Sequence, residues 1–181
     1  IAGELGMTKG ALYKHYKNKR DIFDSILNHV CRLDMERSKK TGMPEDDFDK
    51  MPQPFRNTTV ESVMAYMKAQ FSYWTEDETA CNFRRMLTLE QYRNPEMANL
   101  YQKVLASGPV NYIEDLFREM MLSGTWLEGS PRQMAVEFFA PFYLLLSMSD
   151  AASGKEEKEK VAVLFTTHLE CFVETYAAKM P

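Results

Sequence analysis

The sequence predicts an all-α protein. Apolar residues recur at spacings of three and four along most of the 181-residue chain, and few stretches alternate polar and apolar residues as strands do. Hydrophobic residues make up 45% of the chain, which is enough for a core of ordinary size. Glycines, prolines and capping residues divide the apolar pattern into successive helices, each of which has an identifiable start and stop.

The first two predicted helices are short. Residues 1–5 have the pattern of a helix end, and Gly6 can close that helix in the left-handed conformation. Thr8 can cap the second helix, and Asn18 can cap a third that runs to about Lys40. Because the first residue is Ile rather than Met and stands within a helical pattern, we expect an N-terminal helix to be absent from the sequence.

Residues 41–57, TGMPEDDFDKMPQPFRN, contain three prolines and four acidic residues, so we expect no helix there. They begin the second of two predicted domains, which we place at residues 1–41 and 42–181. Asn94-Pro95 and Ser130-Pro131 each combine a capping residue with a proline at the first helical position. In the second domain we expect helices at about 58–75 and 76–93, a third that starts at Pro95 and is kinked or interrupted at Gly108-Pro109, and two more at 131–152 and 155–179.

Charge is distributed unevenly along the chain. The formal net charge is −4, yet residues 1–20 carry five basic residues and one acidic residue, against 17 basic and 25 acidic residues in 21–181. A basic head on an acidic body indicates nucleic-acid contact.

Two short helices with a tight glycine turn form a helix-turn-helix, whose second helix can enter the major groove. On that helix Leu12 and Tyr16 face inward, and Lys9 and Tyr13 face outward.

The stretch GMTKGALYKHYKNKRDIF resembles the helix-turn-helix of the TetR family of bacterial transcriptional regulators. The family pattern Gly-x-[Ser/Thr]-x-Gly-x-[Leu/Phe]-Tyr-x-[His/Tyr]-[Phe/Tyr]-x-x-Lys is matched at Gly6, Thr8, Gly10, Leu12, Tyr13, His15, Tyr16 and Lys19. The resemblance covers residues 1–27, and the rest of the chain resembles the family only in its helical layout. It implies that DNA is contacted by Thr8, Lys9, Gly10, Tyr13, Lys14, His15 and Lys19.

The resemblance also implies an effector pocket within the helical body. Methionine and aromatic residues at helical spacing usually form a core, but they also line adaptable ligand pockets. The candidates on the middle helices are Met64, Met67, Phe71, Trp74, Phe83, Met86, Leu87, Tyr92, Tyr101, Tyr112, Phe117 and Met121. Arg84 and Arg85 are candidates for neutralising an anionic effector, although we expect at least one of them to be exposed.

The predicted helix at 131–152 is apolar nearly all round, so more than one side of it must be covered. With the last helix it is a candidate for a two-fold interface to which each subunit contributes two helices. The alternative is a fully buried central helix. The candidate interface residues are Phe138, Phe142, Leu145, Leu164, His168 and Phe172.

These observations predict a homodimeric, ligand-responsive regulator, most often a repressor in this family, that leaves its DNA operator when a small molecule binds. The alternatives are a helical protein-interaction module and a helical enzyme; HExxH, GxSxG and GxxxxGK[ST] are all absent from the sequence, which argues against the enzyme.

Three widely spaced cysteines predict neither disulfides nor a metal site, and we expect no cofactor. The most apolar run, VEFFAPFYLLLSM, is shorter than a membrane span and contains Glu137, so we expect a cytoplasmic protein without a membrane partner.

Overall fold

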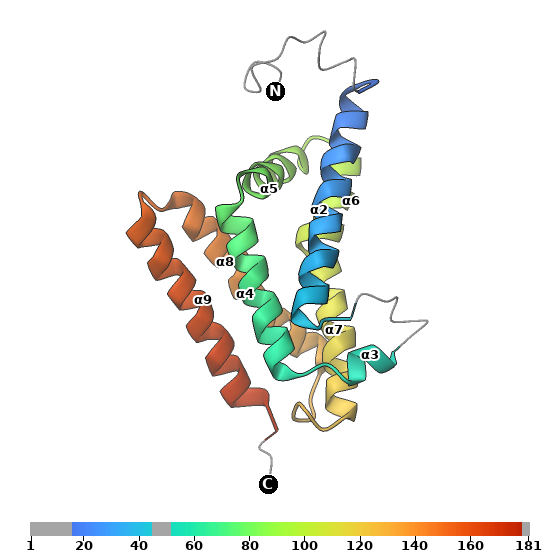
Figure 1. Cartoon of the computed structure of the whole chain (residues 1–181), viewed down its shortest axis with the longest axis vertical. Coiled ribbons are helices and arrows are strands. Elements are labelled where there is room, and N and C mark those ends of the chain that lie inside the picture. The colour runs from blue at the N-terminus through green and yellow to red at the C-terminus, as the bar shows by residue number, and fades with distance from the viewer. Residues whose placement is uncertain (1–15, 45–51, 179–181) are drawn as a thin grey trace. The chain divides into compact units, whose positions relative to one another are not determined.

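The computed structural model describes residues 16–44 and 52–178, and every regular element in these ranges is an α-helix (Figure 1). The helices are α2 Lys19–Thr41, α3 Gln53–Arg56, α4 Val60–Glu76, α5 Glu78–Glu90, α6 Pro95–Leu105, α7 Ser107–Leu122, α8 Pro131–Ala151 and α9 Lys155–Tyr176. One isolated antiparallel bridge joins Trp126 to Ala177 outside the helices. The all-α prediction is confirmed.

The chain divides into two compact units, Ile1–Glu36 and Arg37–Pro181, so the boundary falls inside α2. The part of α2 in the first unit begins with the predicted cap. The Asp21 backbone N–H donates to Asn18 Oδ1 at 2.9 Å, and the Lys17 N–H donates to the Asp21 carboxylate at 2.9 Å. These bonds satisfy backbone donors around the helix N-terminus that have no partner within the helix.

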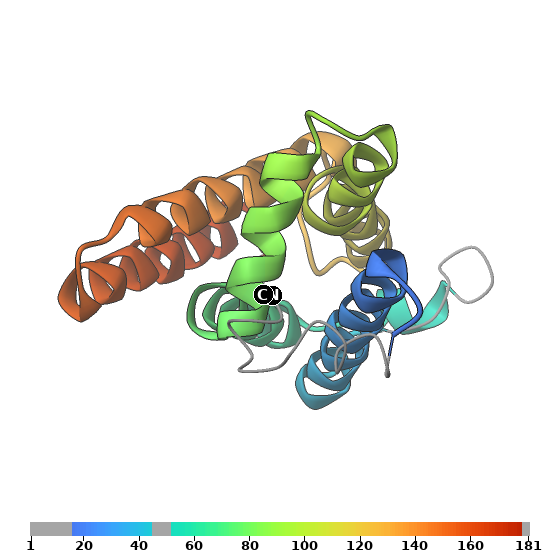
Figure 2. The same cartoon turned by 90° about the horizontal axis from the view of Figure 1, so that it is seen from above.

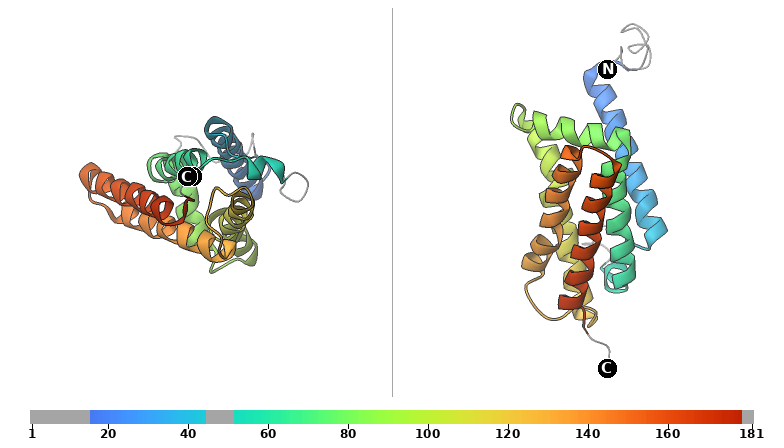
Figure 3. Two further views of the ribbon diagram at one scale, coloured as in Figure 1. Left: turned by 90° about the horizontal axis from the view of Figure 1, so that it is seen from below. Right: turned by 90° about the vertical axis from the view of Figure 1, so that its left-hand side faces the viewer.

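The second unit contains the last turn of α2 and the helices from α3 to α9. In it α7 packs against α3, α6 and α8, while α4 packs against α5, α8 and α9. Helices α8 and α9 lie side by side along one edge of this unit (Figures 2 and 3). Its core contains an aromatic cluster in which neighbouring ring centroids lie 4.8 to 5.8 Å apart, formed by Phe117, Trp126, Phe138 and Phe172.

Local sequence signals set most helix starts in this unit. Thr59, Asn94 and Ser130 accept backbone hydrogen bonds at the starts of α4, α6 and α8, as predicted, and Asp77 does the same for α5. A short side chain with an oxygen acceptor replaces the missing intrahelical partner of the first N–H groups. The predicted helix boundaries therefore hold to within a few residues at these positions.

Two segments differ from the sequence prediction. Helix α3 lies within residues 41–57, where we expected none, because Pro52 and Pro54 occupy the start of a helix, where a missing N–H costs nothing. The interruption expected at Gly108-Pro109 occurs two residues earlier, at Ala106, where φ is −130° and ψ is −97°. Glycine at 108 permits this geometry, since a Cβ there would lie 1.9 Å from the Lys103 carbonyl oxygen.

Helix α8 ends within one residue of the predicted position, and by length and composition alone it could cross a membrane. Eight of its side chains are buried within the protein, from Met134 to Ser149. This burial is typical of the central helix of a bundle, which passes the same test of length and composition.

Candidate functional site

The predicted DNA-contacting surface is described only at its edge. Six of its residues lie outside the residues that the structure describes: Thr8, Lys9, Gly10, Tyr13, Lys14 and His15. The seventh, Lys19, is the first residue of α2 and directly follows the Asn18 cap. The helix dipole favours an anion such as a phosphate at this position.

The predicted effector-pocket residues fall into three groups in the second unit. Seven are buried, at 8% exposure or less: Met67, Phe71, Trp74, Phe83, Leu87, Tyr101 and Phe117. Four are partly buried: Met64, Met86, Tyr112 and Met121. Tyr92 lies in the turn after α5 and is 85% exposed, so it is a surface residue rather than part of an interior site. Phe117 belongs to the aromatic cluster and is a core residue.

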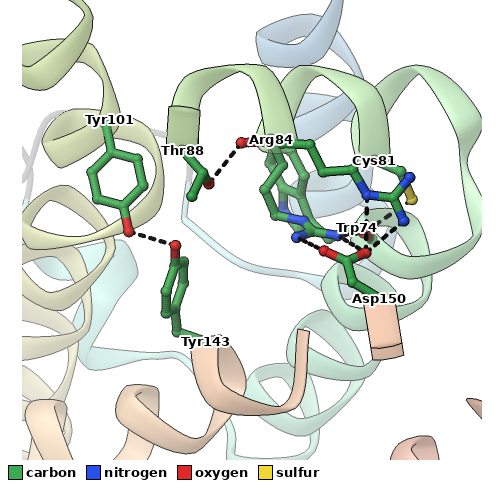
Figure 4. A network of polar contacts seen from close by, with 8 residues as sticks. Trp74, Cys81, Arg84, Thr88, Tyr101, Tyr143 and Asp150 are labelled. Carbon is green, nitrogen blue, oxygen red and sulfur yellow. Dashed lines mark hydrogen bonds and ion pairs between the residues drawn. The ribbon is translucent and has the colours of Figure 1, made fainter. Parts of the chain in front are cut away.

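Two tyrosines join α6 to α8 in the interior. The hydroxyl oxygens of Tyr101 and Tyr143 lie 2.5 Å apart, and the two rings meet edge to face with centroids 6.2 Å apart (Figure 4). Burial raises the pKa of Tyr101, and its hydrogen bond with Tyr143 raises it further, so the Tyr101 phenol stays protonated at neutral pH. The pair therefore presents hydroxyl groups in an aromatic setting.

An ionic network lies close by and joins α4, α5 and α8 (Figure 4). Buried Arg84 donates to both oxygens of Asp150, at 2.7 and 2.9 Å, and to the Trp74 carbonyl at 3.3 Å. Arg85 donates to Asp150 Oδ1 at 2.7 Å, and the Cys81 thiol donates to the Trp74 carbonyl at 3.3 Å. Burial would raise the pKa of Asp150, but hydrogen bonds from both arginines and their positive charges outweigh it and lower the pKa to about 2.

This network changes the role expected for the two arginines. We considered Arg84 and Arg85 as partners for an anionic effector, whereas in the structure the Asp150 carboxylate occupies both guanidinium groups. Sequence reasoning missed Asp150 and Tyr143 as functional candidates. A signal for Asp150 was available, because an acidic residue at the end of so apolar a helix indicates a buried or partly buried cation nearby.

The predicted dimer-interface residues fall into buried, half-buried and exposed groups. Phe138, Phe142, Leu145 and Phe172 are buried within the chain itself, at 6% exposure or less, so they are core residues rather than interface surface. His168 is half-buried, with Nε2 3.0 Å from the Phe138 carbonyl oxygen. Leu164 is 51% exposed, and other exposed apolar side chains of the same two helices are Val136, Leu144, Met148 and Val163. The outer surface of α8 and α9 is thus apolar, but through largely different residues.

Within residues 16–44 and 52–178, no group of three or more His, Cys, Asp or Glu side chains lies together in a way that could hold a metal ion. In the described part of the second unit, the polar side chains that lie together form hydrogen bonds and ion pairs.

Comparison with known proteins agrees with this architecture. No protein-family model matches the chain. A TetR-family transcriptional regulator of Mesorhizobium loti has 15% identity and a TM-score of 0.66, over 97% of this chain and 84% of that one. SmeT bound to triclosan has 19% identity and a TM-score of 0.67, over 99% and 82%. SmeT, the repressor of the Stenotrophomonas maltophilia multidrug efflux pump SmeDEF, has 21% identity and a TM-score of 0.59, over 97% and 77%. The chain therefore has the fold of the TetR-type transcriptional regulators.

Proposed function

We propose that this protein is a DNA-binding transcriptional regulator of the bacterial cytoplasm, a repressor that a small-molecule effector releases from its operator. The observation that carries the proposal is the agreement of two features. The head has the basic helix-turn-helix pattern of residues 6–19, and the fold is that of TetR-type regulators.

DNA binding is tested by titrating fluorescent promoter and random duplexes with the protein at several salt concentrations. Contacts with phosphates release counterions, so the affinity should fall steeply as salt increases. Lys9→Ala and Tyr13→Ala should each weaken binding while the unfolding midpoint stays the same. The matched control is Lys158→Ala, an exposed lysine in α9 outside the basic head. Binding without salt dependence, or equal affinity in all variants, would instead favour a protein-interaction module.

The effector site proposed here is the region where α4, α5, α6 and α8 bring together the Tyr101–Tyr143 pair and the Arg84–Asp150 pair (Figure 4). Because both arginines are already bonded to Asp150 and the tyrosine pair offers hydroxyl groups in an aromatic setting, neutral aromatic compounds with a hydrogen-bonding group suit this region. SmeT, which shares the fold, was solved with triclosan. A thermal-shift screen that includes triclosan and matched carboxylates tests the proposal, because a ligand that binds the folded state raises the unfolding midpoint. Tyr143→Phe should reduce that rise.

The protein is proposed to act as a homodimer through the outer surface of α8 and α9. Five apolar side chains of these helices are at least 40% exposed in the single chain: Val136, Leu144, Met148, Val163 and Leu164. We propose that these side chains form one apolar patch, and such a patch marks an interaction site in a folded protein. In a two-fold symmetric dimer, this surface would be covered by the same surface of a second copy. The dimer would have two DNA-binding heads, which suits a palindromic operator.

A further inference from the structure

Buried Arg84 has one hydrogen-bond donor that its ion pair does not use. Its Nη1 and Nη2 atoms donate to the two oxygens of Asp150, and Nη2 also donates to the Trp74 carbonyl. The third nitrogen, Nε, is buried and has no hydrogen-bond partner among the residues that the structure describes. Because the guanidinium is rigid and planar and Asp150 lies at its Nη1–Nη2 end, the Nε–H points away from this carboxylate.

The acceptors around Arg84 are already in use. Asp150 Oδ1 also accepts from Arg85, whose Nη2 and Nε atoms lie 2.7 and 3.2 Å away. The Trp74 carbonyl also accepts from the Cys81 thiol at 3.3 Å (Figure 4). Among the described residues of this region a donor is therefore left over, and what it needs is an acceptor.

An unpaired donor on a buried cation is costly. The Arg84 side chain is only 5% exposed, so little of it is in contact with solvent. A buried polar group without a partner loses the hydrogen bond that it would make in water, and a charged group loses more than a neutral one. A bound molecule that supplies an acceptor removes this cost, whereas a molecule of the same shape without an acceptor leaves it in place. The Nε–H can therefore discriminate between two compounds that differ in one oxygen atom.

We propose that Arg84 is a ligand-binding residue of the effector site, and that its Nε–H donates to an acceptor oxygen of a neutral aromatic compound, of which an aryl ketone is the simplest case. The aromatic part of such a compound suits the rings of Trp74, Tyr101 and Tyr143 in this region (Figure 4). Asp150 holds the guanidinium at both Nη atoms, so the Nε–H is oriented before a ligand binds. This role rests on the proposed function, because it names the class of compound that the effector site takes.

The test compares two compounds of nearly the same shape on the wild-type protein. Acetophenone has a carbonyl oxygen, and α-methylstyrene has a methylene group in its place. Binding is followed by NMR of isotope-labelled protein, in which the Nε–H signal of Arg84 is assigned through its bonds to the rest of the side chain. Acetophenone should bind about tenfold more tightly than α-methylstyrene and should move this signal downfield. α-Methylstyrene should leave the signal where it is in the ligand-free protein.

Arg118 is the internal control in the same spectra. Its Nη1 and Nη2 atoms also donate to carboxylates, those of Asp115 and Glu114, but its side chain is 42% exposed. Its Nε–H should therefore respond to neither compound. Equal affinities for the two compounds, no binding of acetophenone, or an unchanged Arg84 signal in the acetophenone complex would overturn the proposal and leave the Nε–H to a buried water molecule.

The DNA titrations described above separate this proposal from the proposed function. If Arg84 selects acetophenone but the protein binds no duplex DNA, the regulator is excluded and the ligand-binding role of Arg84 stands. If the protein binds DNA with the expected salt dependence but the two compounds bind alike, the role of Arg84 is excluded and the regulator stands.

Discussion

Arg84 and Asp150 form a bidentate ion pair that joins α5 to the last turn of α8. Nη1 and Nη2 of the arginine lie 2.7 and 2.9 Å from the two carboxylate oxygens. The arginine side chain is 5% exposed and the aspartate side chain 28% exposed. A buried guanidinium without its partner is costly, because it loses both its hydrogen bonds and the charge that compensates it.

We therefore predict that Asp150→Asn lowers the free energy of unfolding by about 2–3 kcal/mol, the lower part of the range for a broken buried pair, since Asp150 is partly solvated. Urea denaturation followed by circular dichroism measures this. The control is Glu159→Gln, which removes an exposed i,i+4 partner of Lys155 and should change the stability little. Equal effects of the two substitutions would show that the Asp150 pair contributes no more than a surface pair.

The same pair predicts a dependence of stability on acid. The pKa of Asp150 is about 2 in the folded protein, below the value of about 3.9 for an unfolded chain, so the folded state favours the charged form. Its contribution is fully present above about pH 4 and is lost as the pH falls through 4 toward 2. The stability difference between wild type and Asp150→Asn should shrink over this interval, which urea titrations at a series of pH values would reveal. A difference that stays constant would contradict the lowered pKa.

Gly108 is predicted to be intolerant of any side chain. Its Cβ would collide with backbone, the Lys103 carbonyl, and a carbonyl in a helix cannot move aside as a flexible side chain can. We expect Gly108→Ala to destabilise the protein by about 1–3 kcal/mol, the range for overpacking. Gly129→Ala is the control, because its Cβ would meet only Met134 Sδ at 3.7 Å, an ordinary contact. Thermal unfolding of both variants measures the difference, and equal midpoints would mean that the α6–α7 break relaxes freely.

A charge on the outer surface of α8 should dissociate the proposed dimer. Leu144 is 60% exposed there, and Leu144→Glu would place two carboxylates, one from each copy, in an apolar interface. Light scattering after size exclusion should then report the mass of a single chain, 21.0 kDa, instead of twice that mass. Leu122→Glu changes an equally exposed leucine at the end of α7 and should leave the dimer intact. A monomeric wild type would remove the dimer from the proposed function.

Local signals in the sequence were sufficient to place the starts of α4, α6 and α8. Thr59, Asn94 and Ser130 have cap bonds to backbone N–H groups two or three residues further on, and such short-range chemistry can be read directly. The sequence did not reveal that the break lies at Ala106, because the close approach of Gly108 to the Lys103 backbone in the preceding helix is seen only in the structure. Glycine and proline at 108 and 109 indicated a break but not its exact position.

In the second unit, tertiary contacts determine which of the predicted aromatic and charged residues are buried and which are exposed, and the sequence alone does not show this. Tyr92 and Tyr101 both occur in helical patterns rich in aromatic residues, yet Tyr92 points to solvent while Tyr101 bonds to Tyr143, 42 positions away. Arg84 and Arg85 are neighbours whose shared partner, Asp150, comes from a distant helix. Periodicity identifies an apolar face but does not tell which of its side chains lie against the chain's own core and which lie outside, as the separation of Phe142 from Leu144 on α8 shows.

The chain's two tryptophans offer a spectroscopic advantage. Trp74 lies at the junction of α4 and α5, beside the arginine network, whereas Trp126 lies in the loop after α7, with its indole N–H 3.2 Å from Met120 Sδ and its backbone paired with Ala177. Replacing either one by phenylalanine leaves a single tryptophan. The emission of the Trp126→Phe variant would then follow ligand-induced changes around Arg84, and that of the Trp74→Phe variant would follow fraying of the C-terminal segment, without any attached dye.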